Sequence, residues 1–493
     1  MSHFMKDDFM TLTEKRAQTI SDKSVSELSI DPKDIVSELI NRAKAAQNQF
    51  EINDQSRLDE AVRALAWSIY KPENARNLAE LAVETTGLGN VESKIIKNQR
   101  KTFGTLRDLL RAKSTGVIER LPEKGLVKYG KPVGVVAAIT PSTNPSATPV
   151  NKAMMAIKCG NPIIIAPSPS AWVATDQTVE GMREELSKIG APLDLVQILP
   201  RPINRQVTTE LMKQADLIVC TGSQNNVRGA YSSGTPAIGV GAGNVAVIID
   251  STADLADASE KITMSKIFDN STSCSSENSL VIVGDIYDEA IKALENAGGY
   301  LATKEEGTRI NNLLWQDNKL NRHLIAKDMN VLKASFDLGS ERDDIKFVMV
   351  EETGIGPDHP LSGEKLSLVL TVYRARDFDH AKELAAEIYD YQGKGHSVGL
   401  HTGEPEKAHE LAREMDVVRV IVNQAHTFAN GGSFENGLAF TLSMGCGTWQ
   451  GNSFSDNLNY KCFMNISHVI ETIPEDKPTE EELFGPHWEK YGK

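Results

Sequence analysis

The chain has 493 residues, of which 40% are hydrophobic and 24% are charged, as is typical of a globular enzyme with two or three domains. A formal net charge of −14 without any basic block argues against nucleic-acid binding. No apolar run approaches the roughly 18 residues of a membrane span, and the segment Met1 to Arg16 has no apolar signal-peptide core. We therefore expect a cytoplasmic protein with neither a nucleic-acid nor a membrane partner.

The first 131 residues are predicted to be mainly helical. Apolar residues recur at helical spacing and then give way to a short extended stretch. The predicted helices are 31–47, 55–86 and 90–113, and the extended stretch is 120–131.

From residue 132 on, short apolar runs alternate with helical patterns, which favours parallel sheets covered by helices on both faces. The predicted strands are 132–139, 163–166, 193–199, 217–220, 245–249, 279–283, 366–373, 397–400, 417–422 and 462–470. The predicted helices are 149–159, 171–189, 204–214, 254–268, 286–297, 379–390 and 406–415. This pattern predicts an α/β fold with two α/β domains and a small strand-rich arm.

The five cysteines give the first chemical candidate. They are Cys159, Cys220, Cys274, Cys446 and Cys462. Their odd number and wide spacing argue against a disulfide framework and against a metal site. Cys274 lies in the polar segment 269–278, between a predicted helix and a strand, where a thiol is expected to be exposed and near backbone N–H groups that favour the thiolate. It is either a nucleophile or an ordinary loop cysteine.

Three further segments follow or precede strands, where ligands bind in α/β sheets. The segment from Thr140 to Pro145 follows a strand and contains Asn144, whose amide is suited to an oxyanion, or it is a proline-rich turn. Thr221-Gly-Ser223 ends a strand and is either a pyrophosphate site or a tight turn. The glycine-rich segment 239–243 precedes a strand, so we reject it as a dinucleotide fingerprint but expect a close backbone approach there.

Taken together, these segments resemble the aldehyde dehydrogenase superfamily, and within it the branch that forms acyl-coenzyme A. The resemblance covers roughly residues 130 to 470 and rests on five segments that occur in family order. These are the loop 140–145, the long segment 231–244, the cysteine segment 269–278, His359-Pro-Leu-Ser-Gly-Glu-Lys-Leu366 and Met444-Gly-Cys-Gly-Thr-Trp-Gln-Gly-Asn452.

The resemblance implies a role for each segment. Cys274 would be the nucleophile, and the oxyanion would lie between Asn144 and the backbone N–H of Cys274. Glu364 would hold the nicotinamide-side ribose of NAD or NADP. The full set of residues that the resemblance implies for the cofactor is Thr140, Pro141, Ser142, Thr143, Ser168, Gly222, Ser223, Gly239, Val240, Gly241 and Glu364.

Two departures from relatives carry chemical information. Hydrolytic relatives have a glutamate general base where this chain has Gly239, so coenzyme A rather than water is expected to take the acyl group. NAD-specific relatives have a lysine and a glutamate near residues 166–170, where this chain reads Ala-Pro-Ser-Pro-Ser. Because no carboxylate is present there to repel a 2′-phosphate, NADP is permitted.

The run 443–459 resembles the members of this branch that act on sulfoacetaldehyde, with plain acetaldehyde as the alternative. We expect His426, Thr427 and the backbone amides of Gly431 and Gly432 to bind the sulfonate. The alternative is that His426 is a structural loop residue. Arg100, Lys101 and Arg228 are other candidate cations, although each is more typical of a solvated surface charge.

The resemblance also implies a domain plan and an assembly. Residues 1–118 with 133–249 would bind the cofactor, 250–454 would be catalytic, and 119–132 with 455–493 would form an arm that pairs subunits into a homodimer or homotetramer. The partners expected are a small aldehyde or acyl-CoA. Rival hypotheses are a hydrolytic aldehyde dehydrogenase, an acyl-phosphate reductase of the same fold, and a non-enzymatic assembly protein with docking segments at 1–16 and 474–493.

Overall fold

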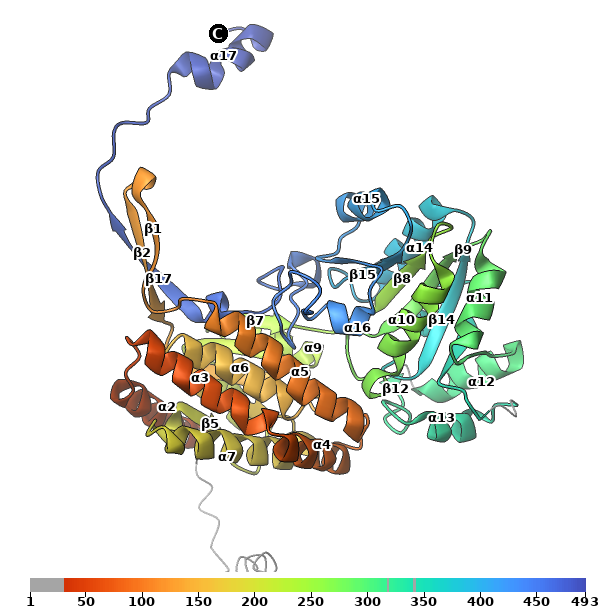
Figure 1. The fold of residues 1–493 in the computed structure, drawn as a ribbon, viewed down its shortest axis with the longest axis horizontal. Coiled ribbons are helices and arrows are strands. Elements are labelled where there is room, and N and C mark those ends of the chain that lie inside the picture. The colour runs from red at the N-terminus through yellow and green to blue at the C-terminus, as the bar shows by residue number, and fades with distance from the viewer. Residues whose placement is uncertain (1–30, 317–318, 340–342) are drawn as a thin grey trace, which may run out of the picture.

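The computed structural model describes residues 31–316, 319–339 and 343–493, and two parallel sheets dominate it (Figure 1). The first has five strands in the order β5-β4-β3-β6-β7, and the second has seven in the order β10-β13-β14-β9-β8-β15-β16. Both are covered by helices, so the predicted α/β class with two α/β units is confirmed. Residues 1–16, a candidate docking segment, lie outside the described residues.

The first sheet has apolar side chains on both faces. On β3, Val136 and Ala138 pack into one hydrophobic cluster with α3, α6 and α7, while Ala137 and Ile139 pack into another with α2 and α8. Alternation along the strand therefore gives two buried faces. The strands are β3 (Val136–Thr140), β4 (Ile163–Pro167), β5 (Val196–Ile198), β6 (Leu217–Thr221) and β7 (Ala237–Val240). The helices are α2 (Pro32–Gln49), α3 (Gln55–Tyr70), α4 (Pro72–Thr86), α5 (Val91–Leu110), α6 (Ala147–Lys158), α7 (Trp172–Lys188), α8 (Arg205–Gln214) and α9 (Gln224–Tyr231).

The second sheet is built in the same way. Its strands are β8 (Val245–Ile249), β9 (Glu277–Val283), β10 (Gly299–Leu301), β13 (Phe347–Glu351), β14 (Val369–Ala375), β15 (Val398–His401) and β16 (Val420–Val422). Its helices are α10 (Leu255–Ile267), α11 (Tyr287–Asn296), α12 (Lys304–Leu314), α13 (Met329–Phe336), α14 (Phe378–Tyr391) and α15 (Glu406–Glu414). Short elements nearby are β11 (Trp315–Gln316), β12 (Lys319–Leu320) and α16 (His426–Ala429).

The strands differ from the sequence-based prediction in several places, and β10 and β13 of the second sheet were not predicted at all. The strand 245–249 was grouped with the first unit, but β8 pairs with β9 and β15 in the second sheet. No strand was predicted at 237–240, and residues 239–240 were included in the glycine-rich segment 239–243, but residues 237–240 form β7 at the edge of the first sheet. An apolar run predicts a buried strand without saying which of two neighbouring sheets it joins.

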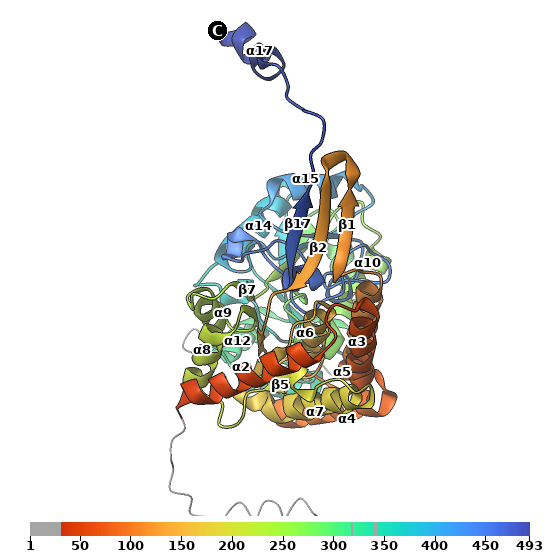
Figure 2. The same ribbon diagram turned by 90° about the vertical axis from the view of Figure 1, so that its left-hand side faces the viewer.

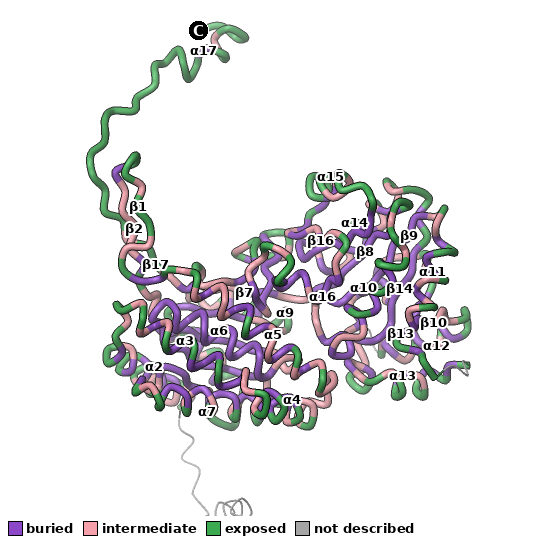
Figure 3. Tube along the Cα trace, viewed as in Figure 1, coloured by how far each residue is buried: buried purple, intermediate pink, exposed green. Residues whose placement is uncertain are grey.

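The arm is a three-stranded antiparallel sheet that stands away from both units (Figure 2). It consists of β1 (Gly116–Leu121), β2 (Leu126–Pro132) and β17 (Met464–Ile470), and the chain then runs on to α17 (Glu480–Tyr491). The expected pairing of the segment near 120–131 with the chain after Ser455 is present, because β17 pairs with β2 along its whole length. The segment around α17 is almost entirely exposed (Figure 3). Within the described ranges, no helix is both long and apolar enough to cross a membrane.

The connection between the two sheets brings β7 close to the cysteine turn. Only residues 241–244 separate β7 from β8. Asn244 anchors the connection, since its side-chain amide donates to the carbonyl oxygens of Ser362 and Gln392 at 2.8 and 3.2 Å. A Cβ atom on Gly243 would lie 2.1 Å from the backbone oxygen of Cys274, closer than non-bonded atoms can approach. Glycine at 243 is therefore required by packing.

We predict that Gly243→Ala destabilises the protein by about 1–3 kcal/mol, the usual cost of overpacking a closely packed site. The measurement is thermal unfolding followed by circular dichroism. Gly181→Ala is the matched control, because Gly181 lies in α7 with no atom within 4 Å of its added Cβ. The control should be neutral or slightly stabilising, and an equal loss in both variants would contradict the packing argument.

Candidate active site

A cavity of about 430 Å³ lies where the two units meet. The first unit contributes the loops that follow β3 and β6, and the second contributes the turn before β9 and the segment around residue 364. Most of the residues singled out from the sequence line it together, as expected for carboxyl ends of parallel strands. These are Thr140, Pro141, Ser142, Thr143, Asn144, Ser168, Gly222, Ser223, Gly241, Cys274, Glu364, Thr427 and Gly431.

The turn that carries Cys274 is held by contacts on both sides. Before it, Asp269, Asn270 and Ser271 have φ angles of 51°, 51° and 60°, a left-handed conformation that is unfavourable for residues other than glycine. After it, Ser275 accepts two hydrogen bonds, from His426 Nδ1 to its carbonyl oxygen at 2.9 Å and from the Asn430 amide to its hydroxyl at 2.9 Å. These contacts fix the position of the intervening thiol.

The left-handed turn is stabilised by a buried ion cluster. The Asp269 carboxylate is fully buried and forms ion pairs with the ammonium groups of Lys94 and Lys97 from α5. It also accepts a hydrogen bond from the backbone N–H of Asn90 at 3.0 Å. Although burial opposes it, the two lysines hold the pKa of Asp269 below its ordinary value. Helix α5 of the first unit thereby positions the cysteine turn of the second.

The environment of Cys274 differs from the sequence-based expectation of an exposed thiol that is readily ionised. The residue is only partly exposed. Burial, followed by the nearby Glu364 and Cys446, raises the pKa of the thiol to about 12. The free protein therefore holds Cys274 as a thiol at neutral pH, because desolvation outweighs what nearby backbone N–H groups contribute.

The loop after β3 places Asn144 in the same cavity. Lys94 Nζ donates to the Thr143 carbonyl oxygen at 3.1 Å, and the Thr175 hydroxyl donates to the Pro145 carbonyl oxygen at 2.9 Å. The loop is thus held on both sides of Asn144. The side-chain oxygen of Asn144 is buried without a partner among the described residues, and its amide is suited to stabilise an oxyanion.

The first unit offers a surface that fits a dinucleotide. Gly222 and Ser223 lie between β6 and the first turn of α9, where free backbone N–H groups bind phosphate. The hydroxyl oxygens of Thr140 and Ser168 are buried without a partner in the described part of the chain, and both residues line the cavity. Buried polar atoms without partners are rare in folded proteins, so these groups are available to a bound polar ligand.

Glu364 is the only carboxylate among the described residues that line the cavity. Its backbone N–H donates to the side-chain oxygen of Gln392 at 3.0 Å, which fixes the segment. Burial raises the pKa of the Glu364 carboxyl to about 8, although a hydrogen bond from the backbone of Gly243 opposes the shift. Glu364 is thus largely protonated at neutral pH in the free protein.

Two of the residues assigned to the cofactor lie elsewhere. Gly239 and Val240 are buried in β7 and do not line the cavity, whereas Gly241 does. A Cβ atom on Gly239 would lie 2.7 Å from Val227 and 2.9 Å from the Tyr231 ring, both in α9. The strand character of 237–240, which was not predicted, accounts for this difference.

Among the four residues assigned to the substrate, Thr427 and Gly431 line the cavity, while His426 and Gly432 do not. His426 Nδ1 lies 2.9 Å from the Ser275 carbonyl oxygen, which can only accept, so the ring proton is on Nδ1. Burial lowers the pKa of His426 to about 4, so His426 is neutral and Nε2 is an acceptor. The Gly432 N–H already donates to the Ala429 carbonyl oxygen at 3.0 Å.

The sequence-based analysis named Lys101 as a candidate cation but favoured a solvated surface charge. Lys101 is buried and lines the cavity with Cys274. Arg100 stacks on the rings of Phe428, Phe434 and Phe440, while Arg228 is exposed. The spacing of Lys94, Lys97 and Lys101 on one face of a helix was the available signal. Thr441 and Leu442 also line the cavity and were not singled out, and Met444, from the motif 444–452, lines it as well.

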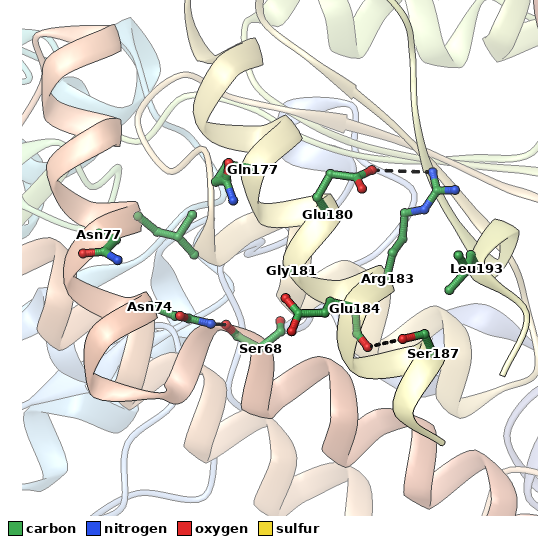
Figure 4. A pocket seen from close by; sticks show the side chains of 11 residues that line it. Ser68, Asn74, Asn77, Gln177, Glu180, Gly181, Arg183, Glu184, Ser187 and Leu193 are labelled. Carbon is green, nitrogen blue, oxygen red and sulfur yellow. Dashed lines mark hydrogen bonds and ion pairs between the residues drawn. The ribbon is translucent and has the colours of Figure 1, made fainter. Parts of the chain in front are cut away.

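A second cavity, of about 440 Å³, lies among α3, α4 and α7 (Figure 4). Several of its polar groups are already paired within it. The Asn74 amide donates to the Ser68 carbonyl oxygen at 2.7 Å. A guanidinium nitrogen of Arg183 lies 3.7 Å from a carboxylate oxygen of Glu180. None of the residues singled out for chemistry lines this cavity.

The site and fold can be compared with known proteins. A model of the aldehyde dehydrogenase family matches residues 13–314. The chain is 51% identical over 459 residues to the sulfoacetaldehyde dehydrogenase (acylating) of Cupriavidus necator, covering 93% of each chain. It is 43% identical over 462 residues to the enzyme of the same name from Bilophila wadsworthia, covering 92% of this chain and 98% of that one.

The fold agrees with these relatives. The structure of an acetylating aldehyde dehydrogenase from Geobacillus thermoglucosidasius superposes with a TM-score of 0.88 at 34% identity, covering 92% of this chain and 100% of that one. The matches to the two sulfoacetaldehyde enzymes cover 93% and 92% of this chain. The chain therefore belongs to the aldehyde dehydrogenase family and is an oxidoreductase of its acylating branch.

Proposed function

We propose that the protein oxidises sulfoacetaldehyde reversibly to sulfoacetyl-CoA, with NAD(P)⁺ as hydride acceptor and Cys274 as nucleophile. The observation that carries this proposal is a partly exposed cysteine whose neighbouring carboxylate, Glu364, is assigned to the cofactor ribose, with glycine at the position where hydrolytic relatives have their base. Position 239 is glycine, and Glu364 is the only carboxylate among the described residues that line the cavity. An acyl group on Cys274 would therefore be released to a thiol more readily than to water.

The first step is loss of the Cys274 thiol proton to solvent, after which the thiolate attacks the aldehyde carbonyl carbon. The carbonyl oxygen then carries the negative charge, which the Asn144 amide and the backbone N–H of Cys274 stabilise in our assignment. Losing one such donor typically slows a reaction by about 10²–10³-fold. Loss of the aldehyde hydrogen as hydride leaves a thioester on Cys274.

The cofactor would lie along the first unit. Its pyrophosphate would contact the backbone N–H groups at Gly222 and Ser223, and Glu364 would accept hydrogen bonds from the nicotinamide-side ribose. Thr140 and Ser168 offer unpaired hydroxyls to the same ligand. When bound, the cofactor supplies the hydride acceptor. Since no carboxylate lies beside Ser168 among the residues that line the cavity, both NAD and NADP are expected to bind.

Coenzyme A completes the reaction as a second substrate. Its thiol attacks the thioester carbonyl carbon, and the Cys274 sulfur leaves, so that one thioester replaces another. Because the two bonds are alike, the exchange is nearly balanced and the reverse reduction of an acyl-CoA is also expected. Acetaldehyde is the alternative substrate, with acetyl-CoA as its product. The 51% identity to a relative named for sulfoacetaldehyde favours the sulfonate.

The arm supports a proposal about assembly. β1 and β17 lie on either side of β2, and each leaves one edge without a strand among the described residues. Strand edges of this kind pair readily with another chain. We infer that the arm pairs subunits into a homodimer or homotetramer.

The two sheets suggest how the rest of the chain is divided. We infer that the residues up to β7, apart from the arm, form the cofactor unit. The chain from β8 to about residue 454 then forms the catalytic unit.

The first prediction concerns the reaction itself. With coenzyme A present, sulfoacetaldehyde should give NADH or NADPH with a higher kcat/KM than acetaldehyde. Without coenzyme A, turnover to the free acid should be slow, since glycine stands at position 239, where hydrolytic relatives have the base that activates water. The assay crosses both cofactors with both aldehydes. A kcat/KM for acetaldehyde equal to or above that for sulfoacetaldehyde would exclude the sulfonate, and rapid acid formation without coenzyme A would exclude the acylating reaction.

A second prediction concerns the nucleophile. Cys274→Ala should lower kcat by more than about 10⁴-fold, because removal of a nucleophile abolishes the covalent route. Mass spectrometry of substrate-loaded enzyme should find the acyl adduct in the wild type and not in this variant. Cys462→Ala is the matched control, since Cys462 lies outside the cavity, and it should retain both activity and adduct. An adduct on another side chain would contradict the assignment.

A third prediction follows from the pKa of Glu364, which burial raises to about 8. Below this pH the carboxyl is protonated, and above it the carboxylate can accept two hydrogen bonds from ribose hydroxyls. Cofactor binding should therefore tighten by about tenfold between pH 6.5 and 8.5. Titration by intrinsic fluorescence measures the dissociation constant, and Glu364→Gln should remove the pH dependence. The same pH profile in the glutamine variant would assign the titration to another group.

A further inference from the structure

Lys101 lines the cavity, and its ammonium group has no carboxylate partner among the described residues. Lys101 is 9% exposed, and Nζ donates to the Gly431 carbonyl oxygen at 2.7 Å. Lys94 and Lys97, on the same face of α5, both pair with Asp269. In the part of the chain that the structure describes, no carboxylate forms an ion pair with Lys101. Two of its three N–H donors therefore remain for a ligand.

An ammonium in this position is costly in the free protein. Burial, together with Arg100 and Lys97, lowers the pKa of Lys101 to about 7. A single neutral carbonyl oxygen offsets little of the desolvation of a buried charge. Lys101 lacks an ion pair with a negatively charged group. An anionic ligand from solution can reach Lys101 through the cavity.

Thr427 provides a second donor in the same cavity. Its side chain is 6% exposed, and its hydroxyl oxygen has no partner among the described residues. Its backbone N–H is already used, since it donates to the Ser265 hydroxyl at 2.8 Å. The hydroxyl is therefore the part of Thr427 that is available to a ligand. His426 has no N–H left to offer, because its Nδ1 proton is donated to Ser275.

We propose that Lys101 selects aldehydes that carry an anionic group next to the carbonyl, with the Thr427 hydroxyl as a second donor to that anion. The inference rests on the proposed function and names a residue that determines its substrate. In sulfoacetaldehyde one methylene separates the sulfonate from the carbonyl carbon. The group that binds the sulfonate must therefore lie beside the nucleophile, and Lys101 lines the same cavity as Cys274.

The test uses two variants of Lys101. Lys101→Met removes the charge and keeps the length of the side chain, while Lys101→Gln removes the charge and keeps an N–H donor for Gly431. Both should lower the ratio of kcat/KM for sulfoacetaldehyde to kcat/KM for acetaldehyde by about 10–100-fold, the range expected for a hydrogen bond between charged groups. Activity on acetaldehyde should fall less than activity on sulfoacetaldehyde, whereas a general loss of structure would lower both alike and leave the ratio unchanged.

The matched control is Arg100→Met. Arg100 is the adjacent cation on α5 but does not line the cavity, and its guanidinium donates to the Ser433 hydroxyl at 3.2 Å. It should keep the wild-type ratio or raise it, because removing Arg100 takes away a neighbouring charge that disfavours the Lys101 ammonium. A wild-type ratio in Lys101→Met would overturn the proposal. A wild-type ratio in Lys101→Gln would also overturn it, because the role of Lys101 would then be to hold the Gly431 loop rather than to supply charge.

A binding measurement separates this inference from the proposed function. Ethanesulfonate, which has the sulfonate but no aldehyde, should inhibit acetaldehyde turnover competitively in the wild type, and Lys101→Met should raise its inhibition constant at least tenfold. If sulfoacetaldehyde is not a substrate but ethanesulfonate inhibits in this Lys101-dependent way, the proposed function fails and the anion site stands. Equal inhibition of the wild type and Lys101→Met would overturn the anion site itself.

Discussion

The ion cluster of Lys94, Lys97 and Asp269 is the interaction on which the site depends. It joins α5 of the first unit to the turn before β9 of the second, and all three side chains are at most 5% exposed. Replacing the carboxylate would leave two buried ammonium groups unpaired, which typically costs about 3–5 kcal/mol. The same helix holds the Thr143 carbonyl oxygen through Lys94 and the Gly431 carbonyl oxygen through Lys101. One face of one helix thus positions the oxyanion loop, the nucleophile turn and the substrate loop.

In the free protein, three ionisable side chains that line the cavity are shifted toward their neutral forms. Burial raises the pKa of Cys274 to about 12 and that of Glu364 to about 8, and it lowers that of Lys101 to about 7. Each group is thus shifted toward its neutral form by the same cause, desolvation. Ligands that carry charge of either sign then find groups that can ionise in response. The ionisable groups of the cavity therefore become fully charged only when a ligand binds. The free energy of ligand binding offsets the cost of ionising them.

The sequence predicted most strands of the two sheets, because apolar runs and their alternation with helices reflect burial directly, but it missed β7, β10 and β13. It also predicted which loops line the cavity, since Thr140, Gly222 and Cys274 follow or precede such strands. It did not predict that β8 joins the second sheet, because sheet membership depends on long-range pairing. Nor did it predict the burial of Lys101, because a lysine is usually solvated and only the packed position of α5 turns it inward.

Position 239 lacks a general base because the residue there is glycine. The packing around it also leaves no room for a larger side chain. The Gly239 N–H donates to the Tyr231 hydroxyl at 2.9 Å, and the same hydroxyl accepts from the Ser453 N–H at 2.9 Å. A Cβ atom at 239 would overlap the Tyr231 ring and Val227. A glutamate introduced here would have to displace α9, whose first turn we assign to the cofactor pyrophosphate. A single substitution is therefore not enough to make this site hydrolytic, because release to water and cofactor binding would compete for the same helix.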